Sequence, residues 1–288
     1  MQETKGEQWF RTVNAMFLSL VSLSMLLPFI HVLAKALSHD RYVLAKEVTL
    51  WPKGFQTGAF EFVLNNKQFL ISFGNSIFIT VVGTAISILI TMFTAYPLSR
   101  KIMPHRRAIM FLYVLTMFFS GGLIPTYLVV KGLSLTNSLW SLILPVALAP
   151  FNLILLKNFF SSVPDDMEES AKMDGASNLR ILFTIYAPLS MAAIATISMF
   201  YAVGYWNSFF QALMYITDRN LIPLQVYLMQ IITDQMGMDL ANAESMMNTA
   251  AESVRAATII AAVVPILLIY PFVQKYFVKG VMLGAVKG

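Results

Sequence analysis

Residues Ser76–Leu98 read SIFITVVGTAISILITMFTAYPL, a run of 23 residues that contains no Asp, Glu, Lys or Arg. The hydrocarbon core of a bilayer is about 30 Å thick, and an α-helix needs roughly 20 apolar residues to cross it. The length of this run and its lack of charge therefore predict a transmembrane helix.

Five more runs of similar length also contain no Asp, Glu, Lys or Arg. They are 13–33, 108–129, 139–156, 188–209 and 256–273. We expect an all-α polytopic membrane protein with six transmembrane helices, organised as a single transmembrane domain over 1–288. The first run is too long for a signal peptide and lacks a small-residue cleavage site, so we expect it in the mature protein.

The composition agrees with a chain whose main solvent is lipid. Of its residues, 57% are hydrophobic and 12% are charged, whereas a soluble domain is about 25% charged. Disorder is excluded because it needs low hydrophobicity and high net charge. The absence of cysteine excludes disulfides, thiolate metal sites and a cysteine nucleophile. No concentrated basic stripe occurs, so we expect no nucleic acid partner.

The basic residues of the loops predict the orientation, because cytoplasmic loops carry an excess of Lys and Arg. With the N-terminus in the cytoplasm, twelve basic residues lie inside and eight lie outside. The cluster from Arg100 to Arg107 is the firmest single indication, and we expect both termini to be cytoplasmic. Two long outer segments, 38–73 and 210–254, are too apolar for disorder and predict small ordered elements.

The spans offer little chemistry for an enzyme or a proton relay. Ionisable residues inside a membrane are costly and usually functional, and His31 is the only candidate. We interpret it as a packed or interfacial residue. The patterns GxxxxGK[ST], HExxH and GxSxG are absent. We therefore expect no catalytic residue, no metal site and no ATP bound by this chain through a phosphate loop.

Glycine and proline interrupt three of the spans. The interruptions are Ser120–Gly122 with Pro125, Pro145 with Pro150, and Gly204 with Trp206-Asn207. Broken helices survive at membrane depth only where protein or a water-filled cavity covers the freed backbone groups. Each break is either a kink for helix packing or part of a lined pathway, and three on neighbouring spans favour the pathway.

The segment 161–188, between spans four and five, reads SSVPDDMEESAKMDGASNLRILFTIYAP. Ser162, with Asp165 three residues later, resembles a capping box and predicts a helix start. The acidic residues that follow favour the positive end of the helix dipole. Gly175 tolerates a positive φ angle and predicts the end of this helix.

A second short helix is expected after the glycine. Leu179, Leu182, Phe183 and Tyr186 have the spacing i, i+3, i+4, i+7 and predict one apolar face. Two short helices at a bend, outside the membrane, suit docking into a groove on another protein. A solvated amphipathic connector is the alternative interpretation.

The residues Glu169-Ser170-Ala171-x-x-Asp174-Gly175-Ala176, with Pro188-Leu189 later, resemble the EAA loop of permease subunits of binding-protein-dependent ABC importers. Ser170 stands where the family pattern has its middle alanine. Further segments resemble the carbohydrate branch, of the maltose-permease (MalG) type. These segments are Asn75-Ser76, Pro125-Thr126-Tyr127, Trp206-Asn207 and Lys279-Gly280. Within that branch the chain looks most similar to importers of complex or acidic oligosaccharides, such as alginate.

The resemblance implies a MetI-like permease fold in the bacterial inner membrane and transport by alternating access. It implies a homologous second permease, and by analogy the two permeases form a heterodimer. It also implies two ATPase subunits that bind ATP and Mg²⁺, and a periplasmic or surface solute-binding protein. The ATPase-coupling residues that it implies are Glu168, Glu169, Ser170, Ala171, Asp174, Gly175 and Ala176. A passive channel or facilitator and a membrane scaffold, both without ATP coupling, are the alternatives from other classes.

Sugars present hydroxyl groups and apolar C–H faces, so amides beside aromatic rings suit them. On this ground we expect substrate contacts at Tyr205, Trp206, Asn207 and Gln211. The alternative is that the aromatic residues only mark a membrane interface, where Trp and Tyr are enriched.

Overall fold

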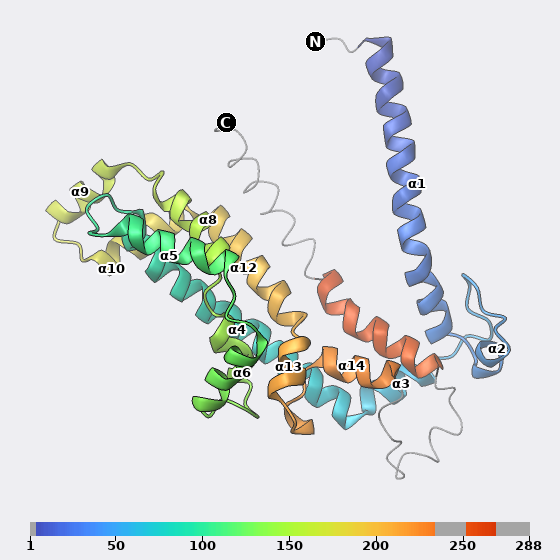
Figure 1. Cartoon of the computed structure of the whole chain (residues 1–288). Helices are drawn as coiled ribbons and strands as arrows, with labels where there is room; N and C mark the ends of the chain where they lie inside the picture. Colours follow the sequence, from blue (N-terminus) through green and yellow to red (C-terminus); the bar gives the residue numbers. More distant parts are fainter. Residues whose placement is uncertain (1–3, 234–251, 269–288) are drawn as a thin grey trace. The chain divides into compact units, whose positions relative to one another are not determined.

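The computed structural model describes residues 4–233 and 252–268, and it is helical throughout these ranges apart from turns and loops, with no strand in either (Figure 1). The elements are α1 (Lys5–Ala36), α2 (Asp40–Leu44), α3 (Gly58–Asn65), α4 (Lys67–Ser99), α5 (Arg106–Phe118), α6 (Leu123–Gly132), α7 (Trp140–Ile143), η1 (Leu144–Val146), α8 (Pro150–Phe160), α9 (Asp165–Met173), α10 (Asn178–Ile181), η2 (Leu182–Tyr186), α11 (Ala187–Leu189), α12 (Met191–Trp206), α13 (Phe210–Tyr215), η3 (Arg219–Leu221) and α14 (Leu224–Ile232). Residues 252–268 form a further helix.

The backbone contacts divide the chain into two compact units. The first unit holds the described residues within 1–70 and 228–265. The second holds those within 71–227 and 266–288. The expected single domain over 1–288 stays a prediction.

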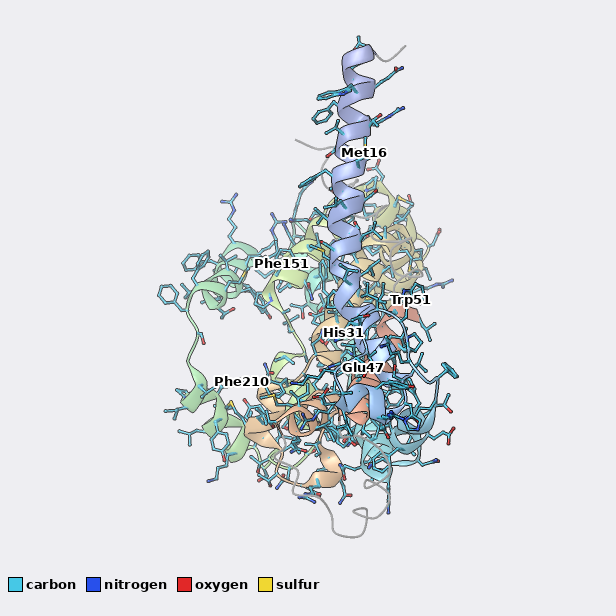
Figure 2. All side chains as sticks on the ribbon, turned by 90° about the vertical axis from the view of Figure 1, so that its right-hand side faces the viewer. Met16, His31, Glu47, Trp51, Phe151 and Phe210 are labelled. Atoms are coloured by element: carbon cyan, nitrogen blue, oxygen red, sulfur yellow. The ribbon has the colours of Figure 1, made fainter. Side chains whose placement is uncertain are left out.

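In the first unit, α1 exposes apolar side chains along most of its length. Trp9, Phe10, Met16 and Phe17 are all more than half exposed, and Figure 2 shows side chains projecting from α1 on several sides. Exposing so many apolar side chains to water is unfavourable, because removing apolar surface from water is the main favourable contribution to folding. A lipid environment removes that penalty, in agreement with the expected first span.

The chain after α1 folds back onto the end of that helix. His39 N–H donates to the carbonyl of Lys53 at 3.0 Å, and Gln56 N–H donates to the carbonyl of Leu37 at 3.0 Å. His31 is partly buried, and its Nδ1 lies 2.6 Å from the carbonyl oxygen of Thr49, which agrees with the expected packed or interfacial residue. The helices α2 and α3 are ordered elements of the kind expected for the segment 38–73. Residues 234–251 of the segment 210–254 lie outside the described part.

Two helices, 6–36 within α1 and the whole of α4, are each long and apolar enough to cross a membrane. Three bent helix pairs meet the same criteria jointly: α5 with α6 at 116°, the segment 140–146 with α8 at 52°, and the segment 178–189 with α12 at 87°. The described ranges thus hold two candidate spans, or up to five if each bent pair crosses the membrane as one span, at the positions of the first five expected spans. Residues 256–268 of the sixth are helical, and 269–273 lie outside the described part.

Two of the expected interruptions are confirmed, and the third is confirmed at Asn207 but not at Gly204. The chain breaks between α5 and α6, where Gly122 has a φ angle of +88°, and again between η1 and α8. Gly204 does not interrupt the fifth span, because α12 runs through it to Trp206. Glycine weakens a helix by only about 1 kcal/mol, which packing overrides. The break in this region falls instead at 207–209, before α13.

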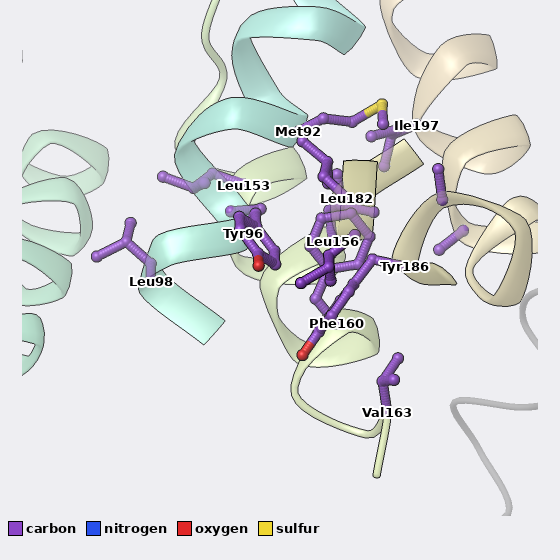
Figure 3. Close-up of a cluster of buried hydrophobic side chains, with 14 residues drawn as sticks. Met92, Tyr96, Leu98, Leu153, Leu156, Phe160, Val163, Leu182, Tyr186 and Ile197 are labelled. Carbon is purple, nitrogen blue, oxygen red and sulfur yellow. The ribbon is translucent and has the colours of Figure 1, made fainter. Parts of the chain in front are cut away.

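In the second unit, α8 packs against α5 and α12. One buried cluster joins the end of α4 to α8 and to the segment 181–187 (Figure 3). Its largest members are Tyr96, Phe160 and Tyr186, whose rings meet edge-to-face: Tyr186 lies 5.0 Å from Tyr96 and 5.5 Å from Phe160 between ring centroids. This cluster holds the loop between spans four and five against the membrane helices.

Candidate functional site

The loop between spans four and five begins with α9, whose N-cap is Pro164 and which has no side-chain cap. The expected capping role of Ser162 is therefore wrong, and its hydroxyl donates instead to the carbonyl of Phe159 at 2.7 Å. Ser162 bonds back to the preceding helix, and the fixed φ of Pro164 already suits a helix start. The expected acidic first turn is present, with Asp165, Asp166 and Glu168.

Gly175 ends α9, as the sequence predicts. Its φ angle is +76°, and a Cβ added there would meet no atom within 4 Å, so the backbone angle rather than space favours glycine. The N–H of Ala176 donates to the carbonyl of Ala171 at 3.0 Å and closes the turn. Ser177 then caps α10 by accepting from the N–H of Arg180 at 3.3 Å.

The expected single apolar face of the second helix is wrong. Ile181, Leu182 and Tyr186 are buried, whereas Leu179 and Phe183 are substantially exposed. The reason is that 182–186 winds as a π-helical turn, which has more residues per turn than an α-helix and rotates the side chains out of the 3.6-residue pattern. The inner residues join the core cluster, and the outer two remain at the surface.

Glu168 lies on the inner side of α9, with 3% of its side chain exposed. It forms an ion pair with Arg100, immediately after α4, and Lys172 Nζ lies 2.8 Å from its Oε1 atom. The hydroxyl of Tyr186 donates to Oε2 at 2.8 Å. A buried carboxylate needs such partners, since removing a charge from water is costly. Glu168 therefore ties the loop to the end of α4, and it does not form part of the exposed surface.

The other residues expected to couple to an ATPase divide into two groups. Those that are exposed are Glu169, Ser170, Asp174 and Gly175, and those that are partly buried against the core cluster are Ala171 and Ala176. Met173 belongs to the same surface, and it is 88% exposed. Acidic groups beside an unpartnered apolar side chain are suited to docking, and the docking role of all seven residues stays a prediction.

A second, exposed ion pair connects the loop to the segment after α4. Lys101 Nζ donates to Asp165 Oδ2 at 2.9 Å, and both side chains are mostly exposed. This hydrogen bond holds the pKa of the Asp165 carboxyl below its ordinary value. Solvent screens such a pair, so it adds little to stability compared with the buried contact of Glu168.

The four residues expected to contact substrate do not lie together. Tyr205 and Gln211 line one pocket. Trp206 is buried against Phe73, edge-to-face, with 6.1 Å between ring centroids. The exposed Asn207 donates from its amide to the carbonyl of Val203 at 2.9 Å, which ends α12.

The tyrosines of α12 cover the break between η1 and α8. Tyr201 accepts from the N–H of Ala149 at 3.0 Å, and its hydroxyl lies 2.8 Å from Thr91 Oγ1 on α4. Thr91 donates to the carbonyl of Ser87 at 2.6 Å, so Tyr201 donates to Thr91. Tyr201 was not expected from the sequence, although it precedes Tyr205 by one helical turn and α4 carries Ser87 and Thr91 at the same spacing.

Tyr205 forms a hydrogen bond with the chain on the other side of the same break, before η1. Its hydroxyl donates to the carbonyl of Ile143 at 3.3 Å and lies 2.8 Å from Ser87 Oγ. Its ring packs on Gly83 of α4, where an added Cβ would come within 2.8 Å of a ring carbon. Protein groups thus replace the hydrogen bonds that the broken helix gives up, which is the condition for such a break within a membrane.

A pocket of about 250 Å³ adjoins the covered break. Its polar residues are Asn152, Tyr201, Tyr205, Ser208 and Gln211, and Phe200 adds an aromatic face. Asn152 lies on α8 and is only 4% exposed. Aromatic faces with a few convergent amides and hydroxyls are the usual lining of a small-molecule site. Across 4–233 and 252–268, no three His, Asp or Glu side chains are placed to hold a metal ion.

Comparisons with known proteins cover both the loop 161–188 and the pocket beside the α8 break. The family described as "Binding-protein-dependent transport system inner membrane component" matches residues 68–283. The chain is 46% identical to the polygalacturonan/rhamnogalacturonan transport system permease protein YtcP of Bacillus subtilis (strain 168), over 94% of this chain and 96% of the relative. It is 43% identical to the protein LplC of the same organism, over 100% of this chain and 98% of the relative.

A solved structure is similar over nearly the whole chain. It belongs to a bacterial ABC transporter involved in the import of the acidic polysaccharide alginate. The TM-score is 0.90 and the sequence identity is 34%, with 96% of this chain and 99% of the other chain covered.

Proposed function

Since the chain belongs to the family of binding-protein-dependent transport system inner membrane components, we propose that it is the permease subunit of an ATP-driven oligosaccharide importer. The observation that carries this proposal is the 46% identity to a polygalacturonan/rhamnogalacturonan permease over 94% of the chain. Family membership also favours an importer over a passive facilitator or a scaffold. The chain has the MetI-like permease fold that is expected from the sequence.

The proposed cargo is an oligosaccharide derived from an acidic polysaccharide. Two relatives support this class: one is named for polygalacturonan and rhamnogalacturonan, and the other belongs to a transporter of alginate. The pocket beside the α8 break offers amides, hydroxyls and aromatic rings, which suit sugar hydroxyls and C–H faces. We assign Tyr205 and Gln211 to this pathway and add Asn152 and Tyr201. Trp206 and Asn207 support its wall and the end of α12.

The remaining components are proposed from the family. A solute-binding protein delivers the substrate, a second permease completes the pathway, and two ATPase subunits bind and hydrolyse ATP with Mg²⁺. Permease subunits of this family are not themselves catalytic. The exposed surface of α9 and its bend, from Glu169 to Gly175, is the proposed contact with an ATPase subunit.

The protein is a component of the inner membrane, and we propose that both of its termini are cytoplasmic. The ion pairs of Arg100 with Glu168 and of Lys101 with Asp165 support this orientation, because they put the basic cluster 100–107 and the loop 161–188 on one side of the membrane. The positive-inside rule makes that side the cytoplasm.

The proposal is tested by co-expressing the chain with a second permease, an ATPase subunit and a solute-binding protein from the same genome. The purified complex is reconstituted in liposomes, and ATP hydrolysis is measured with and without oligosaccharides of alginate or polygalacturonan. We expect hydrolysis to be stimulated by an acidic oligosaccharide together with the binding protein. Oligosaccharide flux that does not depend on ATP would contradict the proposal.

A further inference from the structure

We propose that the buried ion pair between Arg100 and Glu168 is a positioning link, which transmits movement of the loop 161–188 through α4 to the pocket beside the α8 break. This inference rests on the proposed function, because it concerns how ATP-driven movement reaches the pathway. It assigns a role within the subunit to two residues whose side chains are largely buried.

The first argument is the burial of the pair. The side chains of Glu168 and Arg100 are 3% and 16% exposed, whereas those of Asp165 and Lys101, in the neighbouring pair, are 62% and 82% exposed. Burying an ion pair often contributes no net stability over apolar residues of the same size. An apolar contact would therefore be enough to hold α9 against the end of α4. A charged pair with several directional partners fixes the position and rotation of α9 instead.

The second argument is that Glu168 contacts two other parts of the chain besides its own helix. Arg100 follows α4, Tyr186 lies in η2 beyond the glycine bend, and Lys172 lies one turn along α9. The two halves of the bent loop are thus connected to each other and to α4 through one carboxylate. A force applied to the outer surface of α9 must move all three together.

The third argument is the way that Arg100 is fixed to α4. Pro97 lies inside the last turn of this helix and lacks an N–H, so the ladder of backbone bonds is interrupted there. Arg100 bridges the interruption: its Nη1 donates to the hydroxyl of Tyr96 at 3.1 Å, and its guanidinium lies 5.5 Å from the centroid of that ring. Movement of Arg100 is therefore passed to the helical residue before the proline.

The final step runs from Tyr96 along α4 to the pocket. Thr91 and Ser87 lie five and nine residues before Tyr96, which is about 8 and 14 Å along a continuous helix. They contact the hydroxyls of Tyr201 and Tyr205, and these tyrosines line the pocket and hold the α8 break. Rigid helices with discrete side-chain contacts are the physical means by which distant sites are coupled.

The test is a double-mutant cycle in the reconstituted complex, using Glu168→Gln, Arg100→Met and the double variant. The matched control is Asp165→Asn with Lys101→Met, the exposed pair of the same loop. Three quantities are measured: the amount of ATPase subunit that co-purifies, the stimulation of ATP hydrolysis by binding protein with substrate, and the oligosaccharide flux per ATP hydrolysed.

We expect each variant of the buried pair to lower the stimulation by about 5-fold or more, the lower end of ordinary allosteric coupling. The double variant should be no worse than either single variant, because all three break the same link. The ATPase subunits should still co-purify, and the control variants should stay within twofold of the wild type.

Retained stimulation in Glu168→Gln and Arg100→Met would overturn the inference, and so would additive losses in the double variant. Loss of co-purification in proportion to the loss of stimulation would also overturn it, because it would show simple anchorage. Arg100→Lys serves as a milder second variant if Arg100→Met does not insert. If the wild-type complex itself shows no stimulation, the proposed function fails, and this inference fails with it.

Discussion

The ring of Tyr205 lies so close to Gly83 that a Cβ atom on Gly83 would come within 2.8 Å of the ring carbon Cζ. Real side chains essentially never show such a contact, so the two helices α4 and α12 would have to move apart. Through its hydroxyl, the same tyrosine also donates to the carbonyl of Ile143, the last residue of α7, which precedes η1 and the α8 break. One close approach between two helices thus positions the wall of the proposed pathway.

We predict that Gly83→Ala destabilises the protein by about 1–3 kcal/mol, the usual cost of overpacking a core. Gly74→Ala is the matched control on the same helix, because its added Cβ would meet no atom within 4 Å. That control should be neutral or slightly stabilising, since alanine favours a helix. Thermal unfolding of the purified complex measures both. Equal stability of the two variants would show that Tyr205 does not pack on Gly83.

Tyr201→Phe removes the hydroxyl that accepts from the N–H of Ala149. The partly buried N–H then loses its protein partner, which costs up to about 1–3 kcal/mol. We expect lower thermal stability and slower transport, because the break beside the pocket loses its cover. Tyr127→Phe is the control, since Tyr127 stacks on Tyr215 through its ring. The account is contradicted if the two substitutions have the same effect.

Asn152→Ala removes a buried amide from the pocket on α8. We predict that the transport KM for the oligosaccharide rises by about fivefold to tenfold, because one good hydrogen bond to a sugar contributes about 1 to 1.4 kcal/mol. Asn158→Ala is the control, because Asn158 lies on the same helix and is exposed. Flux into liposomes at several substrate concentrations measures the effect. An unchanged KM in Asn152→Ala would remove this pocket from the proposed pathway.

Asp165→Asn tests the exposed ion pair through its pH dependence. The pKa of Asp165 is lowered in the folded protein by its hydrogen bond to Lys101. The pair therefore stabilises the fold above the unfolded pKa of about 3.9, and this contribution is lost as the pH falls through the folded pKa. The small difference in melting temperature between wild type and Asp165→Asn should stay constant from pH 6 to 8. This difference in melting temperature should shrink only in acid. A change in it between pH 6 and 8 would contradict the assignment of the effect to the Asp165–Lys101 pair.

The sequence was sufficient to predict features that depend on local chemistry. Apolar runs indicated the spans, Gly122 and Pro150 marked real breaks, and Gly175 ended α9. Features that depend on distant residues were missed. Nothing local shows that Glu168 pairs with Arg100, 68 positions earlier, and so it was grouped with its exposed neighbour Glu169.

Two further differences have the same origin. In the π-helical turn 182–186, Tyr186 packs on Tyr96 near the end of α4, and the side chains leave the face that the 3.6-residue period predicts. Tyr201 resembles any interfacial tyrosine until its partner Thr91 is known. A search for tyrosines and hydroxyl residues at matching one-turn spacing on different spans would have found this contact.

The central claim is that the bend of the loop 161–188 lies in the cytoplasm and binds an ATPase subunit. The chain has no native cysteine, so a single Met173→Cys variant, at a position that is 88% exposed, reports on one site. Leu133→Cys, between α6 and α7, is the control for the outer surface. A membrane-impermeant maleimide is applied to intact spheroplasts and to inverted vesicles.

We predict that Cys at 133 is labelled in spheroplasts only and that Cys at 173 is labelled in inverted vesicles only. Co-expression of the ATPase subunits should then protect Cys at 173 from the maleimide. Labelling of that position in intact spheroplasts, or labelling that is equally fast with and without the ATPase subunits, would contradict the account.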